Sequence, residues 1–157
     1  MKTAIIFSGQ CRSLQYTYLS LKHYLIDMVP NCDVFIYAAD DKDYRNSIDC
    51  IEYLQPKLVV FKKDKHINES GIVHQQKNIQ EYLQMLNSWK CSNNLRLQYE
   101  KENNFVYDRV IRTRLDIKLF KWLPDISEYD IKNYIYLPNF HNWSSVQGNG
   151  KNDRFAI

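Results

Sequence analysis

Three short apolar runs constrain the fold of this chain more than any other feature. Residues 3–9 read TAIIFSG, residues 32–40 read CDVFIYAAD and residues 57–61 read KLVVF. Short runs rich in β-branched and aromatic residues are typical of strands, and the first two have the continuous apolar character of strands buried on both faces. Such strands are found mainly in parallel sheets, so a parallel sheet is the first expectation.

The segments between and after these runs have helical periodicity. Helices are expected in three places: after a capping Ser13 as far as Met28, over 43–54, and over 74–105 with a kink or an interruption at CSNN (91–94). We interpret the apolar stripe of the third helix, which includes Tyr82 and Trp89, as a packing surface. Two further strands are expected over 108–119 and 134–138. The alternation predicts one α/β domain, a sandwich of helices around a mainly parallel central sheet.

Length, charge and composition exclude several classes of protein. The chain has 157 residues with 45% hydrophobic content, enough for one domain with a core, and a net charge of +3 without any block of like charges. We therefore expect no nucleic-acid partner. No run approaches the ~18 apolar residues of a transmembrane segment, and the four cysteines lack zinc-ligand spacing. The expected location is cytoplasmic, with peripheral association at a membrane face left open.

Polar residues follow several of the predicted strands. In parallel sheets, ligands bind at the carboxyl ends of strands, at the point where the strand order reverses. The segments at that edge are 9–12, Asp40 and Asp41, 114–116 and the loop over 139–153. A ligand site is expected there.

The hexapeptide IRTRLD (111–116) places Arg112, Arg114 and Asp116 on one face of a predicted strand, because alternate residues of a strand face opposite sides. Burying these charges is costly unless each is paired. One interpretation is an edge strand with an Arg–Asp ion pair on its solvated face. The other is an anion site, in which the arginines bind phosphate oxygens. The stretch by itself leaves both open.

Three segments, taken together and in this order, resemble a glycosyltransferase-like family. They are TAIIFSGQCRSL at the start, YDRVIRTRLDI in the middle and NDRFAI at the end. The resemblance implies a Rossmann-like α/β/α sandwich of GT-A type. It also implies transfer of a sugar, in polysaccharide biosynthesis, from a nucleoside-diphosphate sugar to a hydroxyl of a glycan or lipid-linked acceptor. Residues 1–157 would form a single nucleotide-sugar-binding domain, with the N-terminal part of a longer transferase as an open alternative.

The resemblance also implies roles for the residues at the first two strand ends. Gly9 would permit close approach of the nucleotide, Gln10 would contact its base or ribose, and Arg12 would face phosphate. Asp40, after the second strand, would contact a ribose or base.

GT-A enzymes hold a divalent metal, Mn²⁺ or Mg²⁺, with a D-x-D triplet. Asp116 matches the second aspartate of that triplet, and Arg114 stands in place of the first. An arginine attracts the diphosphate but repels a metal ion. We therefore expect Arg112 and Arg114 to neutralise the leaving diphosphate, and Asp116 either to bind the metal or to orient the donor sugar. Metal dependence is left open.

The NDRFAI motif lies beside the active site in the family. Inverting transferases need a carboxylate that takes the proton from the acceptor hydroxyl. Asp153 is the expected catalytic base, and Asn152 beside it is an expected substrate-binding residue; capping of a turn is the alternative for this pair. A non-catalytic nucleotide-sugar-binding module, or a degenerate transferase, remains the alternative function.

Overall fold

A computed structural model describes residues 1–40, 45–63, 66–68, 79–122, 125, 129–130, 132–136 and 155–156. Within these residues, five strands form one sheet in the order β3-β2-β1-β4-β5. The parallel strands are β1 (Thr3–Gly9), β2 (Cys32–Ala39), β3 (Leu58–Lys62) and β4 (Arg109–Arg114). The short β5 (Phe155–Ala156) pairs with β4 in the antiparallel sense. The predicted α/β class with a mainly parallel sheet is therefore confirmed.

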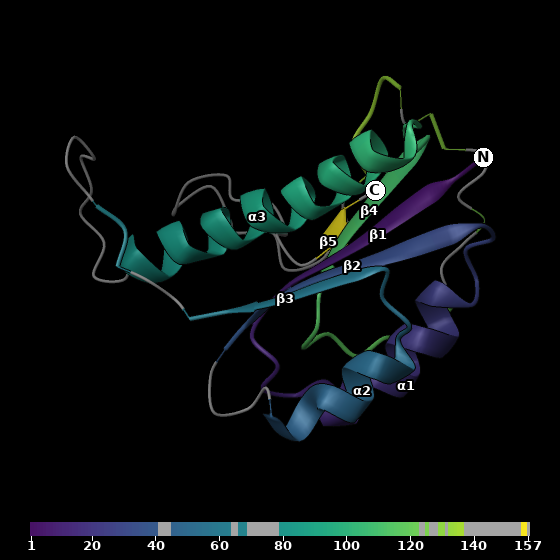
Figure 1. Ribbon diagram of the computed structural model, residues 1–157. Helices are drawn as coiled ribbons and strands as arrows, with labels where there is room; N and C mark the ends of the chain where they lie inside the picture. Colours follow the sequence, from purple (N-terminus) through teal and green to yellow (C-terminus); the bar gives the residue numbers. More distant parts are fainter. Residues whose placement is uncertain are drawn as a thin grey trace, which may run out of the picture.

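Helices cover both faces of this sheet, which makes three layers (Figure 1). One face carries α1 (Leu14–Leu21), which continues as the π-helix η1 (Lys22–Ile26), and α2 (Ile48–Tyr53), which follows the 3₁₀ turn η2 (Arg45–Ser47). The other face carries α3 (Ile79–Asn103), and no second helix of the described residues lies there. Ser13 precedes α1 as predicted, but its side chain makes no capping hydrogen bond.

The core has two parts, one on each face of the sheet. The larger part lies under α1 and α2; it includes Ile5, Phe7, Leu14, Leu21, Ile36, Leu54 and Ile111, which are almost completely buried. The smaller part lies under α3 and is aromatic; it contains Ala4, Phe35, Tyr99, Phe105 and Tyr107. Because alternate residues of β1 and β2 supply both parts, these strands are buried on both faces, as their sequences predict.

Helix α3 runs without a break through 91–94, so the predicted interruption there is wrong. The polar residues of that stretch find partners inside the helix. The Ser92 hydroxyl donates to the Trp89 backbone carbonyl at 3.0 Å. The side-chain oxygen Oδ1 of Asn93 accepts from Arg96 Nε at 2.9 Å. Both bonds lie within α3, so these side chains are accommodated without ending the helix.

Strand β4 ends at Arg114, although the sequence predicts a strand as far as 119. The chain turns toward α1 after this point. Thr17 Oγ1 donates to the Leu115 carbonyl at 2.7 Å, and the Leu119 N–H donates to Ser20 Oγ at 3.2 Å. These bonds replace the strand hydrogen bonds that a longer β4 would make.

The strand predicted over 134–138 is absent from its described part, 134–136. There the Tyr134 N–H donates to the Asp130 carbonyl at 3.1 Å, and the Asp130 N–H donates to the Tyr136 hydroxyl at 3.0 Å. Local hydrogen bonds of a turn therefore take the place of a strand ladder. Among the helices of the described chain, none has the length and apolar character needed to span a membrane.

Candidate functional site

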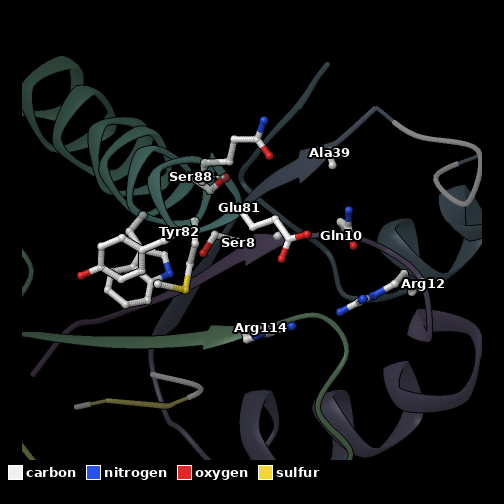
Figure 2. Close-up of a pocket in the computed structure, with 12 residues that line it drawn as sticks. Ser8, Gln10, Arg12, Ala39, Glu81, Tyr82, Ser88 and Arg114 are labelled. Carbon is white, nitrogen blue, oxygen red and sulfur yellow. Dashed lines mark hydrogen bonds between the residues drawn. The ribbon is translucent and has the colours of Figure 1, made fainter. Parts of the chain in front are cut away.

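A pocket of about 720 Å³ opens at the carboxyl ends of the parallel strands (Figure 2). The strand order reverses here, since β2 and β3 lie on one side of β1 and β4 on the other. The lining residues come from the ends of β1, β2 and β4, the loop after β1, and α3: Ser8, Gly9, Gln10, Arg12, Ala39, Glu81, Tyr82, Gln84, Met85, Ser88, Trp89 and Arg114. A cavity of this size is typical of small-molecule sites. The pocket lies at the edge where the sequence predicts a ligand site.

The loop after β1 delivers three of the predicted residues to this pocket. Gly9 has φ +117°, a left-handed backbone conformation that strains any other residue, although a Cβ there would meet no atom within 4 Å. The chain leaves the strand at this point, and Cys11, which is 1% exposed, anchors the loop in the core. Gln10 and Arg12, on either side of Cys11, are exposed and line the pocket.

Asp116 holds two arginines at the floor of the pocket. Arg114 donates to it through two bonds, Nε to Oδ1 at 2.8 Å and Nη2 to Oδ2 at 2.7 Å. Arg12 Nη2 donates to Oδ2 at 2.9 Å. Burial favours a higher pKa for this carboxyl, but the hydrogen bonds and charges of Arg114, and then of Arg12, outweigh burial and lower the pKa of Asp116. The carboxylate is ionised at neutral pH and fixes both guanidinium groups.

This arrangement is a poor fit for the metal that the family resemblance implies. Both oxygens of Asp116 already accept from guanidinium groups, which repel a cation. In the described part of the chain, no three His, Cys, Asp or Glu side chains gather in a way that could hold a metal ion. Binding of Mn²⁺ or Mg²⁺ at Asp116 stays a prediction, and no chemistry below is routed through a metal.

Arg112 shares the α3 face of β4 with Arg114, yet it does not line the pocket. Its guanidinium carbon lies 3.8 Å from the centroid of the Trp89 ring, a cation–π contact. The first interpretation of IRTRLD was an edge strand with an Arg–Asp ion pair, and such a pair exists between Arg114 and Asp116. Strand β4 is not an edge strand, however, because β5 pairs with it at Arg112 and Thr113.

Asp40 does not line the pocket. Asp40 follows β2, where its N–H donates to the Lys62 carbonyl at 3.0 Å, and its neighbour Ala39 lines the pocket instead. Asn152 and Asp153 lie outside the described residues. Their roles as substrate-binding residue and catalytic base stay predictions.

Half of the lining comes from α3, which the sequence analysis treated as a packing helix. Tyr82 and Trp89, assigned there to the packing stripe, line the pocket together with Met85, at spacings of three and four. The polar residues Glu81, Gln84 and Ser88 form a second row at the same spacing and were missed. The sequence did contain a signal for this. A row of polar residues lies beside the aromatic stripe on the helix surface, whereas a helix that is packed over its whole length would have apolar residues at those positions.

The pocket has charges of opposite sign on its two sides. Figure 2 shows the Glu81 carboxylate, from α3, and the Arg12 guanidinium, from the loop after β1, pointing into the same space. Arg114 lies on the same side as Arg12. Guanidinium groups bind phosphate or carboxylate, whereas a carboxylate accepts hydrogen bonds from hydroxyl groups. The pocket can therefore bind a ligand that is anionic at one end and rich in hydroxyls at the other.

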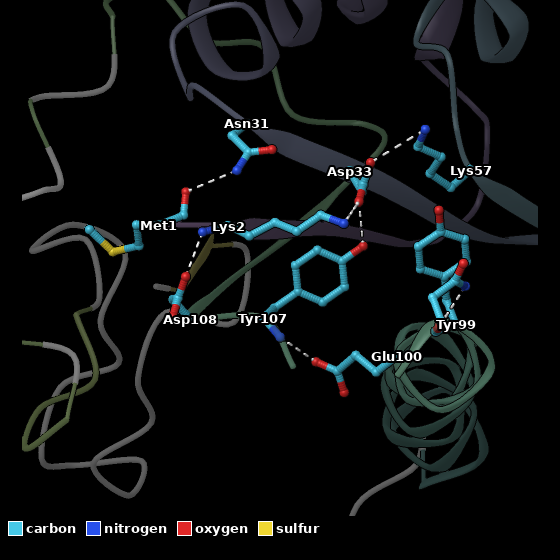
Figure 3. Close-up of polar contacts among 10 residues, drawn as sticks. Met1, Lys2, Asn31, Asp33, Lys57, Tyr99, Glu100, Tyr107 and Asp108 are labelled. Atoms are coloured by element: carbon cyan, nitrogen blue, oxygen red, sulfur yellow. Dashed lines mark hydrogen bonds and ion pairs between the residues drawn. The ribbon is translucent and has the colours of Figure 1, made fainter. Parts of the chain in front are cut away.

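The opposite edge of the sheet carries a polar cluster around Asp33 (Figure 3). Asp33 at the start of β2 accepts from the Tyr107 hydroxyl at 2.6 Å and forms ion pairs with Lys2 at 3.1 Å and Lys57 at 3.6 Å. Lys2 Nζ also lies 3.7 Å from the centroid of the Phe105 ring. The Asp33 carboxylate, the Tyr107 hydroxyl and the lysine ammonium groups therefore satisfy one another's hydrogen bonds and charges, next to aromatic rings.

The pKa shifts at this edge follow from the same contacts. Burial works to raise the pKa of Asp33, but hydrogen bonds from Tyr107 and Lys2 and the charges of both lysines lower it. Burial, and then the hydrogen bond to Asp33, raises the pKa of Tyr107 well above its ordinary value. Tyr107 is therefore a permanent donor and Asp33 a permanent acceptor at neutral pH.

Comparison with known proteins gives one match. Neither the curated proteins nor the solved structures include a match to this chain. A family match covers the sequence over residues 1–157. The chain belongs to the family described as a domain of unknown function (DUF7796).

Proposed function

We propose that this domain is a glycosyltransferase of Rossmann-like GT-A type. It binds a nucleoside-diphosphate sugar in the pocket at the strand ends and transfers the sugar to a hydroxyl of a glycan or lipid-linked acceptor. The observation that carries this proposal is the pair of arginines, Arg12 and Arg114, held by Asp116 at the point where the strand order reverses. The resemblance of the three sequence motifs to sugar transferases supports the same assignment.

The arginine pair suits a diphosphate. A guanidinium has five N–H donors in a planar fork that matches phosphate oxygens. Arg12 donates to Asp116 through Nη2, and its side chain is 54% exposed, so much of its guanidinium surface faces the pocket and solvent. Sugar transfer leaves negative charge on the departing diphosphate. Fixed cations beside that charge stabilise the transition state more than the ground state.

The rest of the lining suits a ligand with many hydroxyl groups. Glu81 and Gln84 on α3, Gln10 on the loop and Ser8 at the end of β1 offer acceptors and donors to a sugar and a ribose. Gly9 allows the backbone to approach the ligand closely. Asp153 remains the proposed base for the acceptor hydroxyl, and the arginines, rather than a metal, neutralise the diphosphate.

A non-catalytic nucleotide-sugar-binding module is the second candidate. The observation that favours it is the engagement of Asp116 by two arginines in place of a D-x-D pair of carboxylates. Such a domain would bind the donor through the same residues and would not turn it over.

Thermal unfolding with a panel of nucleoside diphosphates and their sugars, each with and without Mn²⁺, tests donor binding. A ligand at a hundred times its dissociation constant stabilises the fold by about 2.7 kcal/mol. We expect a rise in Tm of about 5–10 °C with one nucleotide class, since 1 kcal/mol shifts Tm by about 2–4 °C in a domain of this size. A shift that requires Mn²⁺ would restore the metal role of Asp116. The absence of any shift would contradict the proposal.

Turnover distinguishes the two candidates. The enzyme should slowly hydrolyse its donor sugar to free nucleoside diphosphate, and Asp153→Asn should abolish transfer while donor binding persists. Tight nucleotide binding without hydrolysis would instead favour the binding module.

A further inference from the structure

An aromatic wall forms the α3 side of the pocket. Trp89 lines the pocket, and the Arg112 guanidinium stacks on its ring with 3.8 Å between the guanidinium carbon and the ring centroid. Arg112 itself is not among the residues that line the pocket. The part of the indole that faces the pocket is therefore surface that this guanidinium leaves uncovered.

The contact with Arg112 affects which group suits that surface. A cation over one face of an indole is attracted by its π electrons and draws them toward itself. The uncovered surface is then poorer in electrons, which disfavours a second cation and weakens contact with the C–H groups of a sugar. Flat, electron-rich rings such as nucleobases remain suitable, because they stack on aromatic side chains through their π faces.

The positions of the two arginines on β4 agree with a nucleotide. Arg112 and Arg114 lie two residues apart on one face of the strand, which is about 6.6 Å along it. Trp89 packs on Arg112, whereas Arg114 is at the pocket floor with Arg12. A ring stacked on Trp89 would lie next to the anion-binding groups without occupying them. In a nucleoside diphosphate the ribose separates base from phosphates in the same manner.

We infer that Trp89 is the base-stacking residue of this pocket and that Arg112 is a positioning residue behind it. The ligand class is a nucleoside diphosphate, free or carrying a sugar, rather than a simple sugar phosphate. Tyr82 and Met85 lie on the same face of α3 and extend the wall toward the start of the helix. This inference rests on the proposed function, since it names the part of the donor that α3 binds.

The fluorescence of Trp89 provides a direct test. The chain has three tryptophans, so the double variant Trp122→Phe, Trp143→Phe keeps Trp89 as its only indole. Its emission is titrated with inorganic pyrophosphate, a panel of nucleoside diphosphates and a panel of sugar 1-phosphates. We expect the matching nucleoside diphosphate to quench Trp89 emission, because its base stacks on the indole.

Calorimetric titration of Trp89→Leu measures what stacking contributes to affinity. Loss of one base stack should weaken binding of the nucleoside diphosphate by about tenfold or more and leave pyrophosphate binding unchanged. The matched control is Trp122→Leu. Trp122 is 62% exposed, lies against His23 and is not a pocket residue, so both affinities should stay as in the wild type.

Each other outcome overturns a definite part of the inference. If the wild type binds nucleoside diphosphates and Trp89→Leu binds them with the same affinity, Trp89 is not a stacking residue, while the proposed function stands. If the variant weakens pyrophosphate equally, its role is structural. If sugar 1-phosphates lose affinity instead, the wall binds the sugar. If the wild type binds neither pyrophosphate nor any nucleoside diphosphate, the proposed function and the inference both fail.

Arg112 is tested as a positioning residue with two variants. Arg112→Gln should shift the emission maximum of Trp89 and weaken binding of the nucleoside diphosphate without weakening binding of pyrophosphate. Arg112→Lys keeps the cation, so both its emission maximum and its nucleotide affinity should lie closer to those of the wild type. If pyrophosphate binding falls as much as nucleotide binding, Arg112 binds phosphate directly, as the sequence analysis expected.

Discussion

The two edges of the central sheet both gather acidic and basic side chains, but they place them in different surroundings. At the amino ends of the strands, Asp33 is the shared partner of Lys2, Lys57 and Tyr107. At the carboxyl ends, Asp116 is the shared partner of Arg12 and Arg114. In each case one carboxylate, with its pKa lowered, binds two cations.

The difference lies in what surrounds the cations. Lys2 lies against the aromatic rings of Phe105 and Tyr107. Arg12 and Arg114 line a pocket that the described residues leave open. Charges enclosed by their own partners stabilise the fold, whereas charges beside a cavity can also bind a ligand. The comparison teaches that an ion pair indicates a site only together with the space next to it.

Helix α3 contacts both environments. Its second half supplies Tyr99 to the aromatic core and Glu100, whose carboxylate accepts from the Tyr107 N–H at 2.8 Å. Its first half supplies Glu81 and Trp89 to the pocket. One continuous helix thus joins the well-packed amino edge to the open carboxyl edge.

The largest effect on stability is expected from Asp33→Ala. The substitution leaves the buried Tyr107 hydroxyl without its acceptor, which costs about 1–3 kcal/mol. The two lysines also lose their partner, but they are partly exposed and add little to this loss. Urea unfolding measures the loss. The matched control, Asp40→Ala at the other end of the same strand, should change stability by less than about 0.5 kcal/mol. Equal losses for the two variants would show that the amino edge has no special structural role.

Arg114→Ala should weaken ligand binding strongly and lower the stability of the fold only slightly. Hydrogen bonds to charged groups contribute about 1.5–3 kcal/mol, so pyrophosphate affinity should fall by about tenfold or more. The stability loss should stay near 1 kcal/mol, since the side chain is 29% exposed and Arg12 still pairs with Asp116. Calorimetric titration and urea unfolding measure the two effects. Lys57→Ala, which removes a cation from the amino edge, is the control and should leave pyrophosphate binding unchanged. If Arg114→Ala also binds pyrophosphate as the wild type does, Arg114 is not an anion-binding residue.

Thr17→Val tests whether α1 holds the turn that positions Asp116. Thr17 is 3% exposed, and its hydroxyl donates to the Leu115 carbonyl at 2.7 Å. Its loss should cost about 1 kcal/mol of stability and weaken pyrophosphate binding several-fold, because the adjacent Asp116 loses its fixed position. The control is Gln15→Ala, on the exposed side of the same helix. A stability loss with unchanged binding would show that the turn is held by other contacts.

The smallest expected effect is a pH dependence at Asp116. Its folded-state pKa is lowered, by the arginines against the effect of burial, so its ion pairs stabilise the fold above the unfolded pKa of about 3.9 and lose that contribution as pH falls through the folded pKa. At neutral pH, Asp116→Asn should be less stable than the wild type by under about 1 kcal/mol, because Arg12 is largely exposed. The difference should shrink in acid unfolding as the pH falls below the unfolded pKa and through the folded pKa. A difference that is constant with pH would mean that the carboxylate charge contributes nothing.

The sequence by itself determined the local elements and the class of fold. The apolar runs at β1 and β2 specify strands buried on both faces, because no other arrangement removes so many consecutive apolar side chains from water, whereas β3 is only partly buried. The rule that ligands gather at the carboxyl ends of parallel strands pointed to Gly9, Gln10, Arg12 and Arg114, and these residues line one pocket in the structure. These predictions depend only on residues that are neighbours in the chain and on the direction of the strands.

Only the tertiary structure decided the partners. Arg112 and Arg114 have the same alternation in the sequence, yet one stacks on Trp89 and the other lines the pocket with Arg12. Asp116 became the anchor of both pocket arginines because α1 and the turn after β4 bring Arg12 within 2.9 Å of it, although 104 residues separate them. The wall formed by α3 was missed for the same reason. Whether an aromatic stripe packs in a core or faces a cavity depends on the elements opposite it, and sequence periodicity does not contain that information.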